Sequence, residues 1–487
     1  MHKTYLGQKG YSIYKDSISI KEAVFIREEL MMKPYVPKSP VQPEAFPIYK
    51  ESPKKFYVPR IFGITNFGEP NEVKIDNYDK IDIKFAGDLR EQQQIVVDKF
   101  ILNIDNGNCG GLLDLYTGFG KTVVALKLIA VIGVKTLIIV HKGFLVDQWI
   151  ERIQQFLPEA KVGRIQGQII DIENKDIVIG MLQSLSMKEY PDDQFKSFGL
   201  TVVDEVHHIS AEVFVRALQS VVTKYTLGLS ATMNRKDGLT KVFKLFLGDV
   251  VHKEKRKCDN SVLIKAIEFN TSDEDFNNME YDYRGNPAYS TMITKLCSFN
   301  IRSEYILKII KKELEINDKQ QIIVLAHNKN LLTYLFKAIE HRNIATVGYY
   351  IGGMKEKDLK ISETKQILIA TYSMASEGLD IKTLTTLVFA TPKTDIEQAV
   401  GRILRVKHTR PLVIDIIDKH ELFKKQWLKR RLFYHKNGYT IQYTENYDSD
   451  NWSELKKKEP KTLEKNLEKE INNLPVNKCL ISIANLN

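Results

Sequence analysis

The chain has 487 residues, 43% hydrophobic and 10% aromatic, so it can bury cores in two or three domains, which argues against wholesale disorder. Lys and Arg number 71 against 61 Asp and Glu, and the net charge of +10 favours a polyanionic partner without requiring one. The four cysteines lie far apart with no C-x-x-C pair, which argues against a disulfide framework and a zinc site.

The N-terminal segment, residues 1–85, is expected to be a small accessory region. It begins MHKTYLGQKGYSIYKDS, without the apolar core of a signal peptide, and the sequence holds no run of eighteen apolar residues. We therefore expect a soluble, intracellular protein. Between Val36 and Pro59 prolines recur among short polar stretches, which predicts extended, loop-rich structure without long helices.

From Leu89 apolar runs of strand length alternate with segments of helical period, which is typical of parallel α/β architecture. A helix is predicted from Val123 to Ile132, closed by Gly133, and another from Phe144 to Leu157, stopped by Pro158. Residues 86–252 are assigned to this first lobe. Its predicted strands are residues 111–116, 136–140, 176–181, 200–204 and 227–230.

A more polar stretch with acidic and Asn-rich pieces follows, and residues 253–295 are assigned to a connecting or inserted segment. A second α/β series then begins, with an amphipathic helix after Asn328, and residues 296–420 form the second lobe. Two similar layouts in tandem predict two lobes with a cleft between them. The predicted strands here are residues 321–326, 345–349, 366–370, 386–390 and 412–416.

A phosphate-binding loop is predicted at residues 116–122, YTGFGKT, directly after an apolar strand and directly before a helix. Gly118 and Gly120 let backbone N–H groups turn toward phosphates, Lys121 can neutralise their charge, and Thr122 can ligate Mg²⁺. The alternative is a plain glycine turn, because Leu115 occupies the first glycine position of the full G-x-x-x-x-G-K-T pattern.

Two adjacent acids end the apolar strand in TVVDEVHH, residues 201–208, where they are costly unless a cation or water uses them. Asp204 is suited to hold the Mg²⁺ shell, and Glu205 to act as the general base for an attacking water. His207 and His208 stay open between phosphate-linked coupling, zinc binding and an ordinary surface role, and no Cys or His cluster supports zinc.

These segments resemble the motifs of superfamily 2 DNA helicases and translocases, in the same order and over about residues 89–418. Motifs I, II, III and VI correspond to YTGFGKT, the DEAH-type DEVHH, SAT (230–232) and QAVGRILR (398–405). Motifs Ia, Ib and V correspond to HKGFLVDQW (141–149), MLQSL (181–185) and ATYSMASEGLDI (370–381).

Within the superfamily, LREQQ (89–93), the QW pair at Gln148 and Trp149, and DEVHH are most similar to the XPB-like group with its poxvirus, giant-virus and phage relatives. One element departs from that group. Where XPB proteins have Arg-Glu-Asp after the SAT motif, this chain has Arg235, Lys236 and Asp237, so the middle charge is inverted.

The resemblance implies an ATP-hydrolysing motor of two tandem RecA-like lobes that uses ATP and Mg²⁺. Catalysis would rest on Lys121, Glu205, Arg402 and Arg405, with both arginines at the γ-phosphate, and Mg²⁺ would be held by Thr122 and Asp204. Ser230 and Thr232 would couple the lobes. The residues implied to bind the nucleotide are Arg90 and Gln93 near the adenine, Thr117, Gly118, Phe119, Gly120, Lys121 and Thr122 at the phosphates, and Gly378 and Asp380 from the second lobe.

The two arginines lie three residues apart on a predicted helix and so share one face. A guanidinium on that face can stabilise charge in a transition state. The alternative is a pair of surface arginines.

After Asp418 the chain becomes basic and aromatic, and residues 421–487 are assigned to a basic C-terminal extension that ends in a Lys/Glu-rich tail. From Phe423 to Tyr439 lysines and arginines interleave with aromatic residues, which fits nucleic-acid binding through charge and stacking. The alternative is an amphipathic helix that packs its aromatic rings on the second lobe.

The leading hypothesis is an ATP-dependent helicase or translocase acting on DNA in viral transcription, replication or repair. An RNA helicase, the motor subunit of a restriction-type nuclease and a non-hydrolysing scaffold are the alternatives. Strand contacts are expected at Gln183, Ser184, Thr371 and Ser376. We further expect a monomer, no membrane association, transcription or replication proteins as partners, and a location in a viral factory or virion, or otherwise in nucleus or cytoplasm.

Overall fold

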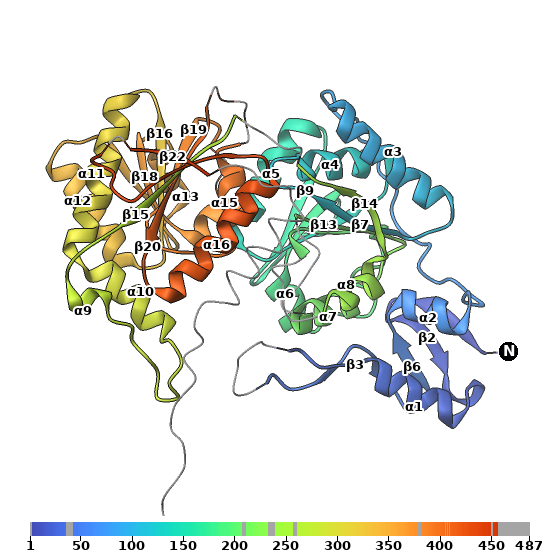
Figure 1. Cartoon of the computed structure of the whole chain (residues 1–487). Helices are drawn as coiled ribbons and strands as arrows, with labels where there is room; N and C mark the ends of the chain where they lie inside the picture. Colours follow the sequence, from blue (N-terminus) through green and yellow to red (C-terminus); the bar gives the residue numbers. More distant parts are fainter. Residues whose placement is uncertain are drawn as a thin grey trace, which may run out of the picture. The chain divides into compact units, whose positions relative to one another are not determined.

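Two compact units make up the chain, Met1–Lys255 and Arg256–Asn487, and each has its own sheets and helices (Figure 1). The computed structural model describes residues 2–35, 42–206, 211–231, 239–256, 261–377, 379, 381–404, 406, 408, 410–449 and 451–455. In this described part, no helix is long and apolar enough to cross a membrane.

The central sheet of the first unit has eight strands in the order β10-β9-β11-β8-β12-β13-β7-β14, all parallel to their neighbours except the β9–β10 hairpin. Strands β7, β8 and β12 are buried along their whole length, as expected of a parallel sheet covered on both faces. The bounds are β7 (Gly110–Leu115), β8 (Thr136–Val140), β9 (Val162–Gln166), β10 (Ile169–Ile170), β11 (Ile177–Met181), β12 (Leu200–Val203), β13 (Tyr225–Ser230) and β14 (Val250–Glu254).

The five strands predicted for this lobe are confirmed to within two residues at each end. Its helices are α3 (Glu91–Asp105), α4 (Lys121–Ile132), α5 (Gly143–Phe156), α6 (Leu182–Met187), α7 (Ala211–Ser220) and α8 (Thr240–Leu247). Gly133 closes α4 as predicted: it takes a left-handed φ of 65°, and its N–H donates to Ile129 O.

The second unit repeats this plan, with the strand order β17-β18-β16-β19-β20-β15-β21-β22 and parallel pairing except between β21 and β22. The five predicted strands are again confirmed to within two residues. The strands are β15 (Leu263–Phe269), β16 (Gln321–Ala326), β17 (Val347–Tyr350), β18 (Ile367–Thr371), β19 (Leu384–Phe389), β20 (Leu412–Asp418), β21 (Thr440–Thr444) and β22 (Ser453–Glu454).

Eight helices accompany this sheet in the described residues: α9 (Glu274–Asn277), α10 (Tyr289–Ser298), α11 (Asn300–Ile316), α12 (Lys329–His341), α13 (Glu356–Glu363), α14 (Tyr372–Glu377), α15 (Glu397–Arg402) and α16 (Glu421–Lys436). The helix expected after Asn328 is α12, and the Asn328 side chain caps it by accepting from Asn330 N. Two segments contain sheet strands that the sequence did not predict. Strand β15 lies in the segment assigned to a connection, and β21 and β22 lie in the C-terminal extension.

The N-terminal region forms an antiparallel sheet, β1-β2-β6-β5, of strands β1 (Thr4–Gly7), β2 (Gly10–Tyr14), β5 (Lys50–Glu51) and β6 (Lys55–Val58). Two helices accompany it, α1 (Ile20–Glu29) and α2 (Arg60–Phe67), and a two-stranded ribbon pairs β3 (Met31–Met32) with β4 (Phe46–Pro47). As predicted for the proline-rich stretch, its described residues 42–59 hold only short strands.

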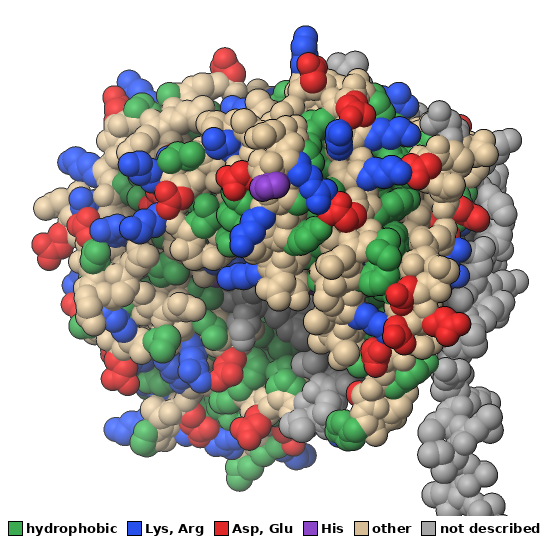
Figure 2. Space-filling view, turned by 90° about the vertical axis from the view of Figure 1, so that its left-hand side faces the viewer, with side chains coloured by type: hydrophobic (Ala, Val, Ile, Leu, Met, Phe, Trp, Pro, Cys, Tyr) green, Lys and Arg blue, Asp and Glu red, His purple; other side chains and the backbone are tan. Residues whose placement is uncertain are grey.

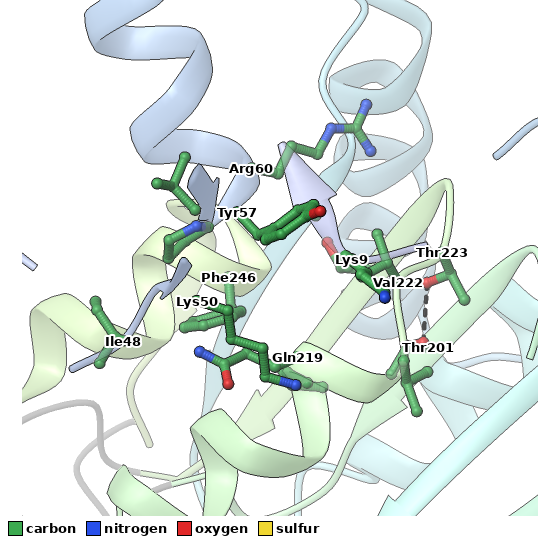
Figure 3. Close-up of a pocket in the computed structure, with 16 residues that line it drawn as sticks. Lys9, Ile48, Lys50, Tyr57, Arg60, Thr201, Gln219, Val222, Thr223 and Phe246 are labelled. Carbon is green, nitrogen blue, oxygen red and sulfur yellow. Dashed lines mark hydrogen bonds between the residues drawn. The ribbon is translucent and has the colours of Figure 1, made fainter. Parts of the chain in front are cut away.

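This region packs on the first α/β sheet through a shared apolar core that includes Phe62 and Leu218. Arg60 Nη1 donates to Lys224 O at 2.7 Å. A small cavity remains beside this contact, and Figure 3 shows Lys9, Lys50 and Tyr57 from the N-terminal region around it with Gln219 and Phe246.

Candidate functional site

Two segments of the first unit meet at one edge of its sheet, because β7 and β12 run in the same direction with β13 between them. The predicted phosphate loop follows β7, and Asp204 and Glu205 follow β12. A salt bridge joins the two segments, since Lys121 Nζ lies 2.8 Å from Glu205 Oε1. The structure thus brings together the two halves of the site that the sequence predicted separately.

The loop before α4 is shaped by two glycines in left-handed conformation, Gly118 at φ 89° and Gly120 at φ 96°. A Cβ on Gly120 would lie 2.4 Å from Gln93 Nε2, so no larger residue fits there without displacement. Because α4 begins at Lys121, its first N–H groups and the positive end of its dipole open into this loop. The arrangement can hold an anion such as phosphate.

Phe119 contributes its backbone to the loop. Its ring is 1% exposed and packs edge-on against Tyr116, with ring centroids 5.4 Å apart. Its carbonyl oxygen accepts from Gln93 Nε2 at 2.9 Å and from the Arg90 guanidinium. Arg90 and Gln93, which the resemblance assigned to the adenine, are therefore placed directly behind the phosphate loop and hold it.

The acid pair is held by contacts that differ for its two members. Asp204 is 7% exposed and accepts from Trp149 Nε1 and from Glu205 N, both at 2.9 Å. Burial and the neighbouring Glu205 carboxylate raise the pKa of Asp204 to about 6. Glu205 takes a left-handed φ of 48°, a sparsely populated conformation for a residue with a Cβ.

Trp149 is a site residue whose role the sequence did not reveal. It is 2% exposed on α5, and its only polar atom reaches the acid at the end of β12. In the sequence, the QW pair indicates only the subgroup. A buried Trp needs a partner for its N–H, and a buried Asp in the same lobe was the available signal.

These residues fit ATP with Mg²⁺. The glycine loop and the start of α4 offer N–H donors, and Lys121 offers a cation, for phosphate oxygens. Carboxylate and hydroxyl oxygens are the ligands that Mg²⁺ prefers, so Asp204 and the Thr122 hydroxyl would hold the metal. Bound Mg²⁺ would neutralise charge on the phosphates.

Comparison with known proteins identifies the family of the chain. Residues 86–235 match the family "Type III restriction enzyme, res subunit", and residues 304–407 match "Helicase conserved C-terminal domain". Over 454 residues the chain is 37% identical to the "Putative ATP-dependent RNA helicase L396" of Acanthamoeba polyphaga mimivirus, covering 90% of this chain and 86% of the relative. The chain belongs to the superfamily 2 helicases.

Two further similarities accompany this one. The helicase is 29% identical over 343 residues to the "Probable helicase D10" of Escherichia phage T5, covering 67% of this chain and 72% of that one. The crystal structure of T4 UvsW aligns with 91% of this chain and 99% of its own at 18% identity and a TM-score of 0.35. The expected giant-virus and phage relatives are thus confirmed.

Motif VI of this helicase contains Arg402, which the structure describes. Arg402 is 8% exposed and lies at the end of α15. Its Nε donates to Ala375 O at 2.7 Å and its Nη1 to Leu379 O at 2.8 Å, so it binds the motif V segment of its own unit. The exposed-surface alternative for Arg402 is therefore wrong, and its predicted contact with the γ-phosphate stays a prediction. Other predicted positions lie outside the described residues, namely His207, His208, Thr232, Arg235, Lys236, Asp237, Gly378, Asp380 and Arg405.

The residues expected to contact a nucleic-acid strand lie at the ends of parallel β-strands or on the helices that directly follow them. Gln183 and Ser184 lie on α6 after β11, where Ser184 Oγ accepts from Gly167 N at 3.0 Å. Thr371 ends β18, with its Oγ1 3.3 Å from Ser373 Oγ, while the side chain of Ser376 lies outside the described residues. Figure 2 shows acidic and basic side chains intermixed on the face it presents, rather than one basic patch there.

The basic C-terminal helix α16 uses its aromatic residues for packing. Phe423, Trp427 and Tyr434 are buried in the two cores of the second unit. Arg430 is buried as well and binds Asp415 through two hydrogen bonds of 2.7 and 2.8 Å. The packing alternative is thus confirmed for these residues, and stacking of these three rings on bases is wrong.

Proposed function

We propose that this helicase is a nucleic-acid-dependent ATPase that moves on DNA. The observation that carries the proposal is the Lys121–Glu205 contact beside the buried Asp204. Lys121 can turn from Glu205 to phosphate oxygens, which releases the Glu205 carboxylate to orient a water and accept its proton. In this proposal Lys121 links phosphate binding in the loop to release of Glu205 as the general base.

The test compares hydrolysis by three variants of the full chain with hydrolysis by the unchanged chain. Lys121→Ala and Glu205→Gln are each expected to reduce the ATPase rate at least a hundredfold, in line with typical losses of a general base. Glu205→Gln should still bind a fluorescent ATP analogue, because Gln removes the base and keeps its shape. Lys127→Ala, which changes a lysine on the same helix outside the loop, is the control. DNA-stimulated turnover unchanged in both site variants would refute the assignment.

The choice of DNA is supported by the resemblance of LREQQ, the QW pair and DEVHH to the XPB-like group, and the name of the mimivirus relative favours RNA instead. A panel of forked, duplex and single-stranded DNA and of RNA of equal length separates the two, scored for hydrolysis and strand displacement. Stronger stimulation by DNA is expected. If only RNA stimulated hydrolysis, RNA would be the substrate instead of DNA, and the assignment of the ATP site would stand.

Two finer parts of the proposal rest on the family. Arg402 and Arg405 would assist turnover at the γ-phosphate, and Gly378 and Asp380 would contribute to the nucleotide site. The viral source of the relatives supports a viral protein. A role in viral transcription, replication or repair, with proteins of those processes as partners, is the finer part of the proposal.

A further inference from the structure

The antiparallel sheet of the N-terminal region has two chemically different faces. Strand pairing places Leu6, Tyr11 and Val58 in one row, and all three are buried in the core beneath the sheet. The neighbouring row on the other face pairs Tyr5 with Ser12, Ser12 with Tyr57, and Tyr57 with Lys50. The second face therefore carries polar and aromatic residues across all four strands.

Lysines line this second face. At the outer edge of β1, Lys74 N donates to Leu6 O. Lys74 Nζ lies 4.7 Å from the centre of the Tyr5 ring and 2.9 Å from Glu72 Oε2. In the next row Tyr14 pairs with Lys55. Lys55 Nζ lies 4.8 Å from the Tyr5 ring centre and 4.4 Å from that of Tyr14. We call Tyr5, Tyr14, Tyr57, Lys50, Lys55 and Lys74 the tyrosine–lysine face.

The rings of this face remain accessible. Tyr5, Tyr14 and Tyr57 are half-buried, and the Tyr5 and Tyr14 centroids are 6.0 Å apart. Neighbouring strands lie about 4.8 Å apart, so Tyr5 and Tyr57, which are two strands apart, are separated by about 10 Å. Lys55 forms no salt bridge with a described carboxylate: its ammonium hydrogen-bonds Tyr5 Oη at 3.2 Å. The face thus offers flat rings and a cation without an acidic partner.

We propose that the tyrosine–lysine face binds single-stranded nucleic acid, with bases stacked on Tyr5 and Tyr14 and phosphates held by Lys55 and, once it leaves Glu72, by Lys74. Stacking needs unpaired bases, because a duplex hides their faces, and lysines on flexible stems can leave the rings for phosphates. This inference adds a second binding surface to the proposed function and rests on it only in the class of substrate.

The path beyond Tyr57 is closed by the rest of the first unit. Tyr57, Lys50 and Lys9 reach the small cavity beside Gln219 and Phe246 (Figure 3), and Lys9 is paired with Asp192 at 2.8 Å. The open part of the face therefore runs from Tyr57 through Tyr14 and Tyr5 to Lys74, and Tyr5 and Tyr14 are the positions to test.

The first measurement is photo-crosslinking of the full chain, without ATP, to halogenated single strands of about ten nucleotides, a length within the range of known single-strand sites. Both DNA and RNA strands are used. Crosslinks are expected on peptides that contain Tyr5 or Tyr14. Crosslinks confined to other peptides with both strands would overturn the proposal, and a difference between the strands identifies the natural ligand.

The second measurement is affinity by fluorescence anisotropy. Tyr5→Leu/Tyr14→Leu is expected to weaken single-strand binding roughly tenfold, because a base–aromatic stack is replaced by an aliphatic contact. Tyr5→Phe/Tyr14→Phe keeps the rings and should bind normally. Tyr35→Leu changes an exposed tyrosine outside the sheet and is the matched control. Equal affinity in the Leu double variant and the control would also overturn the proposal.

Two controls separate this proposal from others. Thermal unfolding of each variant checks that the Leu substitutions leave the fold intact. If the Leu variant is unfolded, crosslinking and the affinity of Lys55→Gln decide instead, with Lys54→Gln as the control. Lys121→Ala should crosslink at the tyrosine–lysine face as the unchanged chain does. Crosslinks there without nucleic-acid-stimulated hydrolysis would reject the proposed function and keep the binding face.

Discussion

Gln93 uses both ends of its amide within the protein. Its Oε1 accepts from Arg90 N at 3.0 Å and its Nε2 donates to Phe119 O at 2.9 Å, and the side chain is 4% exposed. The resemblance assigns Gln93 to the adenine. Its contacts indicate instead that Gln93 positions the phosphate loop. A residue that binds a carbonyl of this loop would affect every nucleotide that the loop holds.

The Gln93→Ala variant tests this role. Loss of a buried hydrogen bond costs about 1–2 kcal/mol, so the Kd for a nucleotide should rise roughly five- to thirtyfold. If Gln93 positions the loop, ATP and GTP should weaken equally in a binding titration. Selective weakening of ATP would instead show that Gln93 reads the adenine. Gln94→Ala, at an exposed neighbouring position, is the control.

Cys297 offers a prediction about pH. Burial raises the pKa of its thiol to about 11, against the opposing charge of Arg302. The folded state therefore keeps the thiol neutral while the unfolded chain ionises near pH 9, so this stabilising contribution is full below pH 9 and is lost as pH rises toward 11. Between pH 8 and pH 10 the free energy of unfolding, measured with urea, should fall by about 1 kcal/mol less in Cys297→Ala than in the unchanged chain. Equal losses in both proteins would contradict the shift.

The site was predictable from the sequence where one short motif fixes the geometry. Lys121 follows a glycine turn and Glu205 follows an apolar strand, and parallel strands bring both to one edge. The contacts of Trp149 and Gln93 were not predictable, because each joins elements whose relative placement only the fold sets.

Helix α16 shows how a basic segment can serve packing. Arg430 is 1% exposed and forms two hydrogen bonds with Asp415 on β20, and Tyr434 Oη donates to the same carboxylate at 2.8 Å. Desolvating this ion pair costs free energy, and removing only one partner would leave a buried charge without compensation. The pair fixes the position of α16 on the sheet.

The Asp415→Asn variant should therefore lower the free energy of unfolding by about 3–5 kcal/mol, because Arg430 is left charged and buried without its partner. Denaturant unfolding measures the loss. Lys429→Gln, one residue away and exposed, should change stability by less than about 0.5 kcal/mol. Replacing both partners, as Asp415→Leu/Arg430→Met, should recover part of the loss, and no recovery would contradict the account.

At the level of elements, prediction succeeded for strands with continuous apolar runs and failed for mixed ones. Strand β15 contains Lys265 and Glu268 within a polar stretch, yet it lies between β20 and β21. Its lysine is tolerated because Lys265 Nζ lies 2.6 Å from the buried Glu313 of α11. Compensation from a distant helix is invisible to local patterning, so the strand was assigned to a connection.

For the whole molecule, the residues proposed for chemistry divide between the two units. Lys121, Asp204 and Glu205 belong to the first unit and Arg405 to the second. Nucleotide affinity should therefore depend mainly on the first unit, and turnover on both. This division predicts that binding and hydrolysis can be lost separately.

The Arg405→Ala variant tests the division. It is expected to bind a fluorescent ATP analogue within about threefold of the unchanged chain and to lose roughly 10³-fold in hydrolysis, the lower range for removal of a transition-state arginine. Lys121→Ala should lose binding as well. Arg410→Ala, at an exposed arginine nearby in the sequence, controls for loss of positive charge. Hydrolysis by Arg405→Ala at the normal rate would reject the role of Arg405 in turnover, because no step of the chemistry would then need that guanidinium.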